Sequence, residues 1–285
     1  MKQDTRTNWN GASIDRRTVL RASAVTAVGI GGAVGASGTV AAGDKKCGET
    51  LEDPPDWYPW YDIENWEDHG VPWGAGEITF YVTGWQANYD RATSQGFECR
   101  QAMEDNGYGA EVVGCHWDSV TGTWSGGKSK ADDMGANLAY LVSWMQDELG
   151  TTIRLVGHSL GARVIGTCLN ELRADGRSVA STAFLGGAIA ADSVVEDCGW
   201  WCTGEFYYGL RDAGGNVHNY HSHEDEVLDG LYTLAEWDRA VGQVGADGTP
   251  PVDYADHDVT AAVGSDHCAY YKRDVGCMDQ VVANL

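Results

Sequence analysis

From residue 77 onward, short apolar runs alternate with longer segments whose apolar residues recur at helical spacing. Leu138, Leu141, Val142 and Met145, for example, lie at positions i, i+3, i+4 and i+7 of one such segment. The apolar runs predict strands at 78–82, 110–116, 152–156, 179–185 and 216–221. The segments between and after them predict helices at 92–103, 160–173 and 230–241, and a long one that follows a Gly/Ser loop at 121–128 and runs through 148.

This alternation predicts the fold class. Strands joined by helices through short connections favour an α/β fold, with a mainly parallel sheet covered by helices on both faces. No internal repeat is visible, so we expect one domain over residues 76–285.

Two segments of the chain do not follow the alternation. Residues 43–75 are acidic and rich in tryptophan, and residues 192–215 carry aromatic side chains together with Cys198 and Cys202. Either segment can be an aromatic strap packed on the domain. The alternative for 192–215 is a cap over a binding cleft.

The first 42 residues have the features of an export signal. The adjacent pair Arg16 and Arg17 precedes a weakly apolar stretch rich in Ala and Gly, from Ala22 to Val40, and small residues follow it. The segment resembles a twin-arginine signal peptide, which implies export of the folded chain by the twin-arginine translocase. A membrane anchor is the alternative, but the many glycines would insert weakly into hydrocarbon. We therefore expect an extracellular or cell-surface protein.

The net charge of the chain argues against two classes of binding partner. The chain has 42 acidic and 19 basic side chains and a formal net charge of −23. Such an acidic balance argues against nucleic acid and against anionic lipid surfaces, because both are bound by clustered Lys and Arg. Lysine is scarce among the basic residues, and an acidic surface of this kind favours a halophilic protein.

Eight cysteines suit an exported protein with structural disulfides. Their connectivity cannot be read from the sequence. Two pairs are close in sequence, Cys198 with Cys202 and Cys268 with Cys277, whereas Cys115 and Cys168 fall in apolar patterns typical of buried thiols.

A candidate nucleophile follows the predicted strand at 152–156. Residues 157–161 read Gly-His-Ser-Leu-Gly, and a predicted helix comes directly after them. Ser159 would then stand in a sharp strand-to-helix turn, where side chains at 157 and 161 would collide with neighbouring backbone. The same turn would place the Ser159 hydroxyl at the positive end of the helix dipole.

In this context the sequence resembles the α/β-hydrolase superfamily, with the lipase-like form of its nucleophile elbow. The resemblance covers about residues 76–284 and implies a serine hydrolase whose partners come in the order nucleophile, acid, histidine. It points to Asp225 as the acid, with Asp229 as the alternative. It points to His267 as the base, with His257 as a weaker candidate.

The resemblance also implies a mechanism. His267 would take the Ser159 proton, and Ser159 would attack an acyl carbonyl and form an acyl-enzyme. The backbone N–H groups of Leu160 and Trp85 would bind the developing oxyanion, and His158 would be structural. A small-molecule or lipid ester is the expected substrate, since the aromatic segment 192–215 suits an apolar acyl group.

Other functions stay open. A thioesterase or amidase could use the same triad, and a surface binding protein on a hydrolase scaffold could use the tryptophan-rich segment instead. We expect no cofactor and no metal. The alternative is a metal site in one crowded segment, where alternation would put His221 and His223 on the same face of a strand. The other candidate ligands of that segment are His218, Asp225 and Asp229.

Overall fold

The computed structural model describes residue 47 and residues 51–199 and 202–285. The predicted export signal, residues 1–42, lies outside the described residues. In the described part, the strands are β1 (Trp60–Asp62), β2 (Glu67–His69), β3 (Glu77–Val82), β4 (Glu111–His116), β5 (Thr152–His158), β6 (Ser181–Leu185), β7 (Asn216–His221) and β8 (Tyr254–Asp258). The α-helices are α2 (Tyr89–Asp105), α3 (Trp124–Leu149), α4 (Gly161–Ala174), α5 (Tyr207–Ala213), α6 (Thr233–Glu236), α7 (Val241–Val244), α8 (Thr260–Val263) and α9 (Met278–Asn284). A 3₁₀ turn, η1 (Ala191–Val194), and a π-helical turn, η2 (Leu228–Tyr232), complete the elements.

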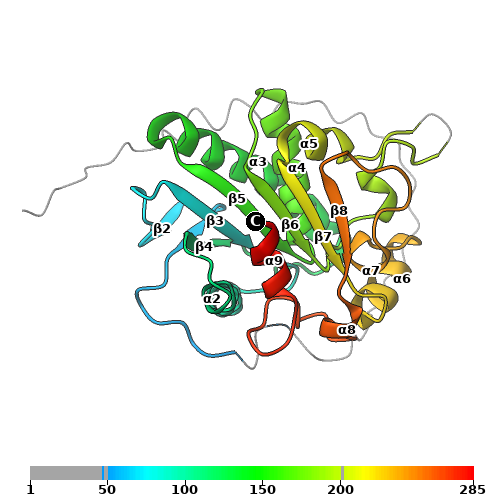
Figure 1. Cartoon of the computed structure of the whole chain (residues 1–285), viewed down its shortest axis with the longest axis horizontal. Helices are drawn as coiled ribbons and strands as arrows, with labels where there is room; N and C mark the ends of the chain where they lie inside the picture. Colours follow the sequence, from blue (N-terminus) through cyan, green and yellow to red (C-terminus); the bar gives the residue numbers. More distant parts are fainter. Residues whose placement is uncertain (1–46, 48–50, 200–201) are drawn as a thin grey trace, which may run out of the picture. The chain divides into compact units, whose positions relative to one another are not determined.

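The described strands form one sheet in the order β2-β1-β4-β3-β5-β6-β7-β8 (Figure 1). All neighbouring pairs are parallel except β1 with β2. The carboxyl ends of the parallel strands therefore meet along one edge of the sheet.

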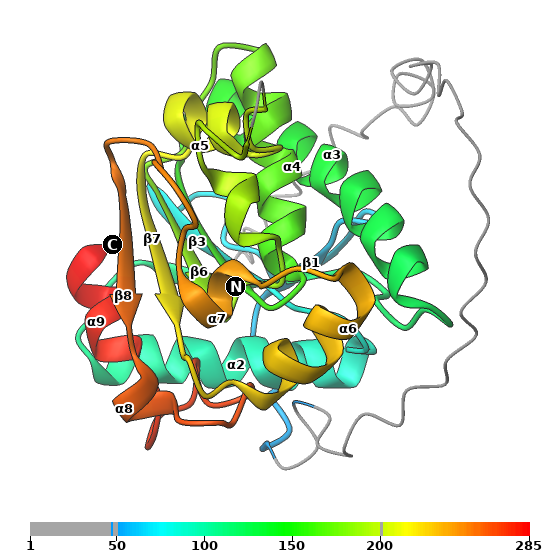
Figure 2. The same ribbon diagram turned by 90° about the vertical axis from the view of Figure 1, so that its right-hand side faces the viewer.

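Helices cover both faces of the sheet, as Figures 1 and 2 show. On one face, Phe80 and Val82 of β3 belong to a core that includes residues of α3, α4 and α5. On the other face, Tyr81 packs in a core with residues of α2 and α9. Successive residues of a strand point to opposite faces, and the residues of β3 from Ile78 to Val82 are all buried because both faces of the strand are covered. The predicted fold class is confirmed: an α/β fold with a mainly parallel sheet between two helical layers.

The edges of the sheet depart from the sequence prediction. β1 and β2 lie within the acidic, tryptophan-rich segment 43–75, where no strand was expected, and β1 pairs with β4. β8 reads Tyr-Ala-Asp-His-Asp and was also missed. Strands with an exposed edge or face need fewer apolar side chains, so their sequences lack the apolar run that identifies an inner strand.

The predicted helix at 230–241 is wrong as a continuous element. η2 runs directly into α6, which ends at Glu236; the next residue, Trp237, has a left-handed backbone with φ of 57°, and α7 begins only at Val241. A non-glycine residue with positive φ cannot continue a right-handed helix, so the chain turns there.

Part of the aromatic segment 192–215 packs on the domain. Phe206 lies against Gly166 of α4, and Gly209 of α5 approaches Asn170 of the same helix closely. α5 is thus the crossover helix between β6 and β7, while a cap formed by this segment stays a prediction. Within the described part of the chain, no helix is both long and apolar enough to span a membrane.

Candidate active site

Ser159 stands in a two-residue turn between β5, which ends at His158, and α4, which begins at Gly161. Its backbone is left-handed, with φ of 55°. Its N–H donates to the carbonyl of Leu185 at 3.0 Å, and its carbonyl accepts from Ala188 at 2.9 Å. A strained conformation of this kind is held only where surrounding structure fixes it, and here the end of β6 and the residues after it do so.

The turn has no room for side chains at its glycines. A Cβ on Gly161 would lie 2.3 Å from the carbonyl oxygen of Val82, and one on Gly157 would lie 2.6 Å from Cδ1 of Ile165. A Cβ on Gly84, in the loop after β3, would lie 2.6 Å from Cβ of Ser159. The strand end of β3 therefore runs directly against the serine.

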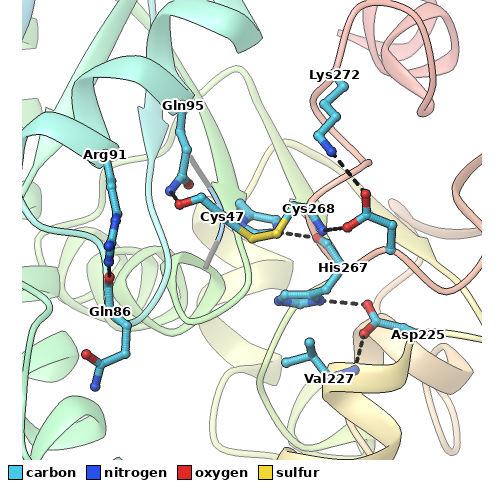
Figure 3. Close-up of a disulfide and its surroundings, with 11 residues drawn as sticks. Cys47, Gln86, Arg91, Gln95, Asp225, Val227, His267, Cys268 and Lys272 are labelled. Atoms are coloured by element: carbon cyan, nitrogen blue, oxygen red, sulfur yellow. Dashed lines mark hydrogen bonds and ion pairs between the residues drawn. A yellow bond between two sulfur atoms is a disulfide. The ribbon is translucent and has the colours of Figure 1, made fainter. Parts of the chain in front are cut away.

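Asp225 and His267 form a buried pair. Nδ1 of His267 lies 2.7 Å from Oδ2 of Asp225, and the two side chains are 6% and 0% exposed (Figure 3). The other carboxylate oxygen accepts the N–H groups of Val227 and Leu228, each at 3.1 Å. The hydroxyl of Tyr270 lies 3.2 Å from Oδ2. Every oxygen of the carboxylate is thus satisfied.

Electrostatics keep this carboxylate ionised. Burial raises the pKa of Asp225, but the neighbouring His267 and the hydrogen bonds to the carboxylate outweigh it and lower the pKa below its ordinary value. An ionised carboxylate can only accept, so Nδ1 of His267 donates the hydrogen, and in the neutral ring Nε2 is the atom with the lone pair. Nε2 is buried and makes no hydrogen bond to any described residue.

His158 connects the serine turn to the loop that carries His267. Its Nε2 lies 2.8 Å from the carbonyl oxygen of His267, and the two rings are 4.8 Å apart. Burial, reinforced by His267, lowers the pKa of His158 to about 3, so the ring is neutral and its Nε2–H donates. His158 has the structural contact expected of it.

The loop of His267 is also tied by a disulfide. Cys268, the next residue, is bonded to Cys47, and Figure 3 shows this bridge beside His267. Cys198 and Cys202 form the second bridge, while Cys277, close to Cys268 in sequence, is a buried free thiol. Cys115 and Cys168 are buried free thiols too, as their apolar surroundings predicted.

The two backbone groups expected to bind an oxyanion flank the serine. Within the described part of the chain, neither the N–H of Leu160 nor that of Trp85 donates a hydrogen bond to protein. The Trp85 ring is held in place, because its Nε1–H donates to Oγ1 of Thr121 at 2.7 Å and the ring packs edge-on against Trp124.

The other candidates have different partners. Asp229 accepts a hydrogen bond from Nε2 of Gln243 at 2.8 Å, and Nε2 of His257 lies 3.0 Å from Nδ1 of His218. Of the two candidate acids, Asp225 pairs with His267, whereas Asp229 pairs with Gln243. Sequence reasoning missed Tyr270 as a partner of that carboxylate. Its position three residues after His267 was the available signal.

The sheet topology together with this strand–turn–helix site defines the class of the protein: an α/β fold of the α/β-hydrolase type. A family described as "Protein of unknown function (DUF726)" matches residues 118–282, more than half of the chain, and the chain belongs to this family. The matched range includes Ser159, Asp225 and His267. No curated protein matches the sequence.

Several solved structures are similar to the chain at low identity. The Listeria innocua lin2722 product is 12% identical with a TM-score of 0.45, over 73% of this chain and 92% of that one. Thermus thermophilus TT1662 is 12% identical with a TM-score of 0.42, over 75% and 89%. An esterase of Pyrobaculum calidifontis is 12% identical with a TM-score of 0.39, over 73% and 75%.

Proposed function

We propose that this protein is a serine hydrolase that cleaves carboxylic esters, with Ser159 as nucleophile, His267 as general base and Asp225 as the acid that orients it. The observation that carries the proposal is the buried Asp225–His267 pair, with Nε2 of His267 unpaired among the described residues. A buried imidazole nitrogen that carries a lone pair and has no partner is suited to accept a proton from a nucleophile.

The proton moves in two directions during the reaction. Nε2 of His267 accepts the hydrogen of the Ser159 hydroxyl as its Oγ attacks the ester carbonyl, and Asp225 stabilises the imidazolium that forms. The tetrahedral intermediate then expels the alcohol, which takes the proton from Nε2. Water, deprotonated by His267 in the same way, cleaves the acyl-enzyme, releases the carboxylic acid and restores Ser159.

The oxyanion is bound by backbone donors. The N–H of Leu160 opens α4, where the helix dipole also favours negative charge. The N–H of Trp85 is the second donor, supported by the close approach of Gly84 to Ser159. Backbone donors fixed before the reaction stabilise developing charge without reorganisation, and each contributes about 10²–10³ in turnover.

We further propose that the enzyme acts outside the cell after export by the twin-arginine translocase. The two disulfides support an oxidising location. The acidic composition supports a salt-rich one, because screening by salt reduces the repulsion among surface carboxylates.

Labelling with a fluorophosphonate tests the nucleophile and its base together. We expect the folded chain to be labelled in molar salt, and Ser159→Ala and His267→Ala to lose labelling while keeping the wild-type circular dichroism spectrum. Asn284→Ala, at the end of α9, is a control that should keep full labelling. A well-folded wild type that is not labelled, or labelling that survives Ser159→Ala, would overturn the proposal.

A further inference from the structure

The ends of β7 and β8 bring together three side chains that the proposed hydrolase mechanism does not use. His221 and Asp258 are the last residues of these strands and are register partners. Paired residues on neighbouring strands point to the same side of the sheet. His223 follows two residues after His221, and their rings are 5.0 Å apart.

These three residues offer a compact set of ligand atoms. One ligand atom from each lies within 4.8 Å of the other two. Oδ2 of Asp258 is 3.9 Å from Nε2 of His223. Two imidazole nitrogens and one carboxylate oxygen form a donor set that suits zinc and similar ions, whereas calcium and magnesium prefer oxygen ligands alone.

The burial of the His221 ring favours a bound cation. His221 is only 6% exposed, and its Nδ1 makes no hydrogen bond to any described residue. A buried nitrogen without a partner is costly, and a bound cation would remove that cost.

Asp258 is both oriented and accessible. Its Oδ1 accepts the N–H of Thr260 at 3.0 Å and the hydroxyl at 2.6 Å, which leaves Oδ2 toward His223. Partners of this kind hold the ligands of a metal site in place. The side chains of His223 and Asp258 are 54% and 56% exposed, so an ion can reach them from solvent.

The remaining polar side chains of the segment are engaged elsewhere. His218 pairs with His257, Asp225 pairs with His267, and Asp229 accepts from Gln243. The set therefore differs from the broader one that the sequence suggested, and it includes Asp258, a residue distant in sequence.

We infer that His221, His223 and Asp258 bind one divalent transition-metal ion of the zinc class, with water in the remaining position. Ligand atoms around tetrahedral zinc lie about 3.3 Å apart, given metal–ligand bonds of about 2.0–2.2 Å. The exposed side chains of His223 and Asp258 would rotate to reach this spacing. The ion would join the ends of β7 and β8 just before the turn that carries Asp225, so its role is to stabilise this loop rather than to react with substrate.

Calorimetric titration of zinc chloride into the chelator-treated, tag-free full chain tests the site. We expect one equivalent to bind to the wild type, and His223→Gln and Asp258→Asn to weaken binding about tenfold or more. Both residues are exposed, so the variants should keep the wild-type fold. His69→Gln removes another exposed histidine, on β2 at the opposite edge of the sheet, and should bind as the wild type does.

Cobalt gives an independent signature. Co²⁺ in a tetrahedral site with nitrogen and oxygen ligands shows intense visible absorption, which should appear on titration of the wild type and be lost in His223→Gln. Binding of zinc should also raise the unfolding temperature of the wild type but not of that variant. A wild type that binds no zinc, equal binding by all variants, or loss of binding in His69→Gln would overturn the inference. Zinc binding is measured without substrate or label, so the metal site and the proposed hydrolase activity can fail separately.

Discussion

Gly84 and Ser159 approach each other so closely that a methyl group on Gly84 would lie 2.6 Å from the Cβ of the serine. The contact joins the loop after β3 to the turn after β5, two parallel strands that are neighbours in the sheet. The N–H of Trp85, the next residue, is positioned by the same contact. The spacing between the proposed nucleophile and the proposed oxyanion donor therefore depends on the absence of a side chain at position 84.

Gly84→Ala should reduce activity while leaving the fold largely intact. The added methyl group would push the loop from the serine, and a displacement of about 1 Å can cost about 10² in rate. Steady-state hydrolysis of a nitrophenyl ester measures the loss in kcat. Gly76→Ala, before the same strand, is the matched control, because nothing lies within 4 Å of a Cβ there. Equal activity in both variants would contradict the proposed oxyanion geometry.

Substitution of the two candidate acids should separate them. Asp225→Asn should lower kcat by about 10⁴, since the amide cannot hold the His267 tautomer that leaves Nε2 as the base. Asp229→Asn should lower kcat far less, because Asp229 contacts Gln243 rather than His267. Measuring kcat of both variants with the same ester at the same pH separates the two candidates. A larger loss in Asp229→Asn would show that the assignment of the acid is wrong.

The inner sheet could be predicted because its strands are buried on both faces. β3, β5 and β6 are mostly buried and contain short apolar runs, and the predicted ranges differ from the observed strands by at most two residues at each end. The edge strands β1, β2 and β8 could not be predicted. At most one face of each is covered, so their sequences are rich in polar residues and show no apolar run. In β2, for example, all three side chains are exposed.

The part of the candidate site that is formed by residues adjacent in the sequence could be predicted from the sequence. Ser159 lies in a turn formed by adjacent residues, so Gly157 and Gly161 mark it in the sequence. The pairing of Asp225 with His267 spans 42 residues and was reached through the order of residues in a resembling family. The proximity of His223 and Asp258 depends on the register of β7 with β8, which no local pattern encodes, and Asp258 was missed for that reason.

The two disulfides should contribute unequally to stability. Cys47 and Cys268 are 221 residues apart in sequence, and Cys198 and Cys202 are 4 apart. A bridge that closes a longer loop removes more entropy from the unfolded chain, which for the long one amounts to about 5 kcal/mol. Denaturant unfolding of the Cys47→Ser/Cys268→Ser double variant should show a loss of this order. The Cys198→Ser/Cys202→Ser variant should lose much less, and the reverse ranking would contradict the prediction.

Acid should destabilise the fold partly through His116. Burial lowers the pKa of this histidine to about 3, since its ring stacks on Trp60 and neither ring nitrogen has a hydrogen-bond partner among the described residues. Below an unfolded pKa of about 6.5, the unfolded chain binds a proton that the folded chain does not bind, so stability falls as pH decreases from about 6.5 toward 3. At pH 5 this histidine alone should lower the free energy of unfolding by about 2 kcal/mol relative to its value at neutral pH.

Replacing His116 with phenylalanine tests this assignment. The apolar ring can keep the stacking on Trp60 and has no proton to bind, so the free energy of unfolding of His116→Phe should fall less steeply between pH 7 and pH 5. The difference in slope should approach one proton per molecule in the lower part of that range. Denaturant titrations at a series of pH values measure both slopes. Parallel slopes for the variant and the wild type would mean that His116 is protonated equally in the folded and unfolded states, which its buried position argues against.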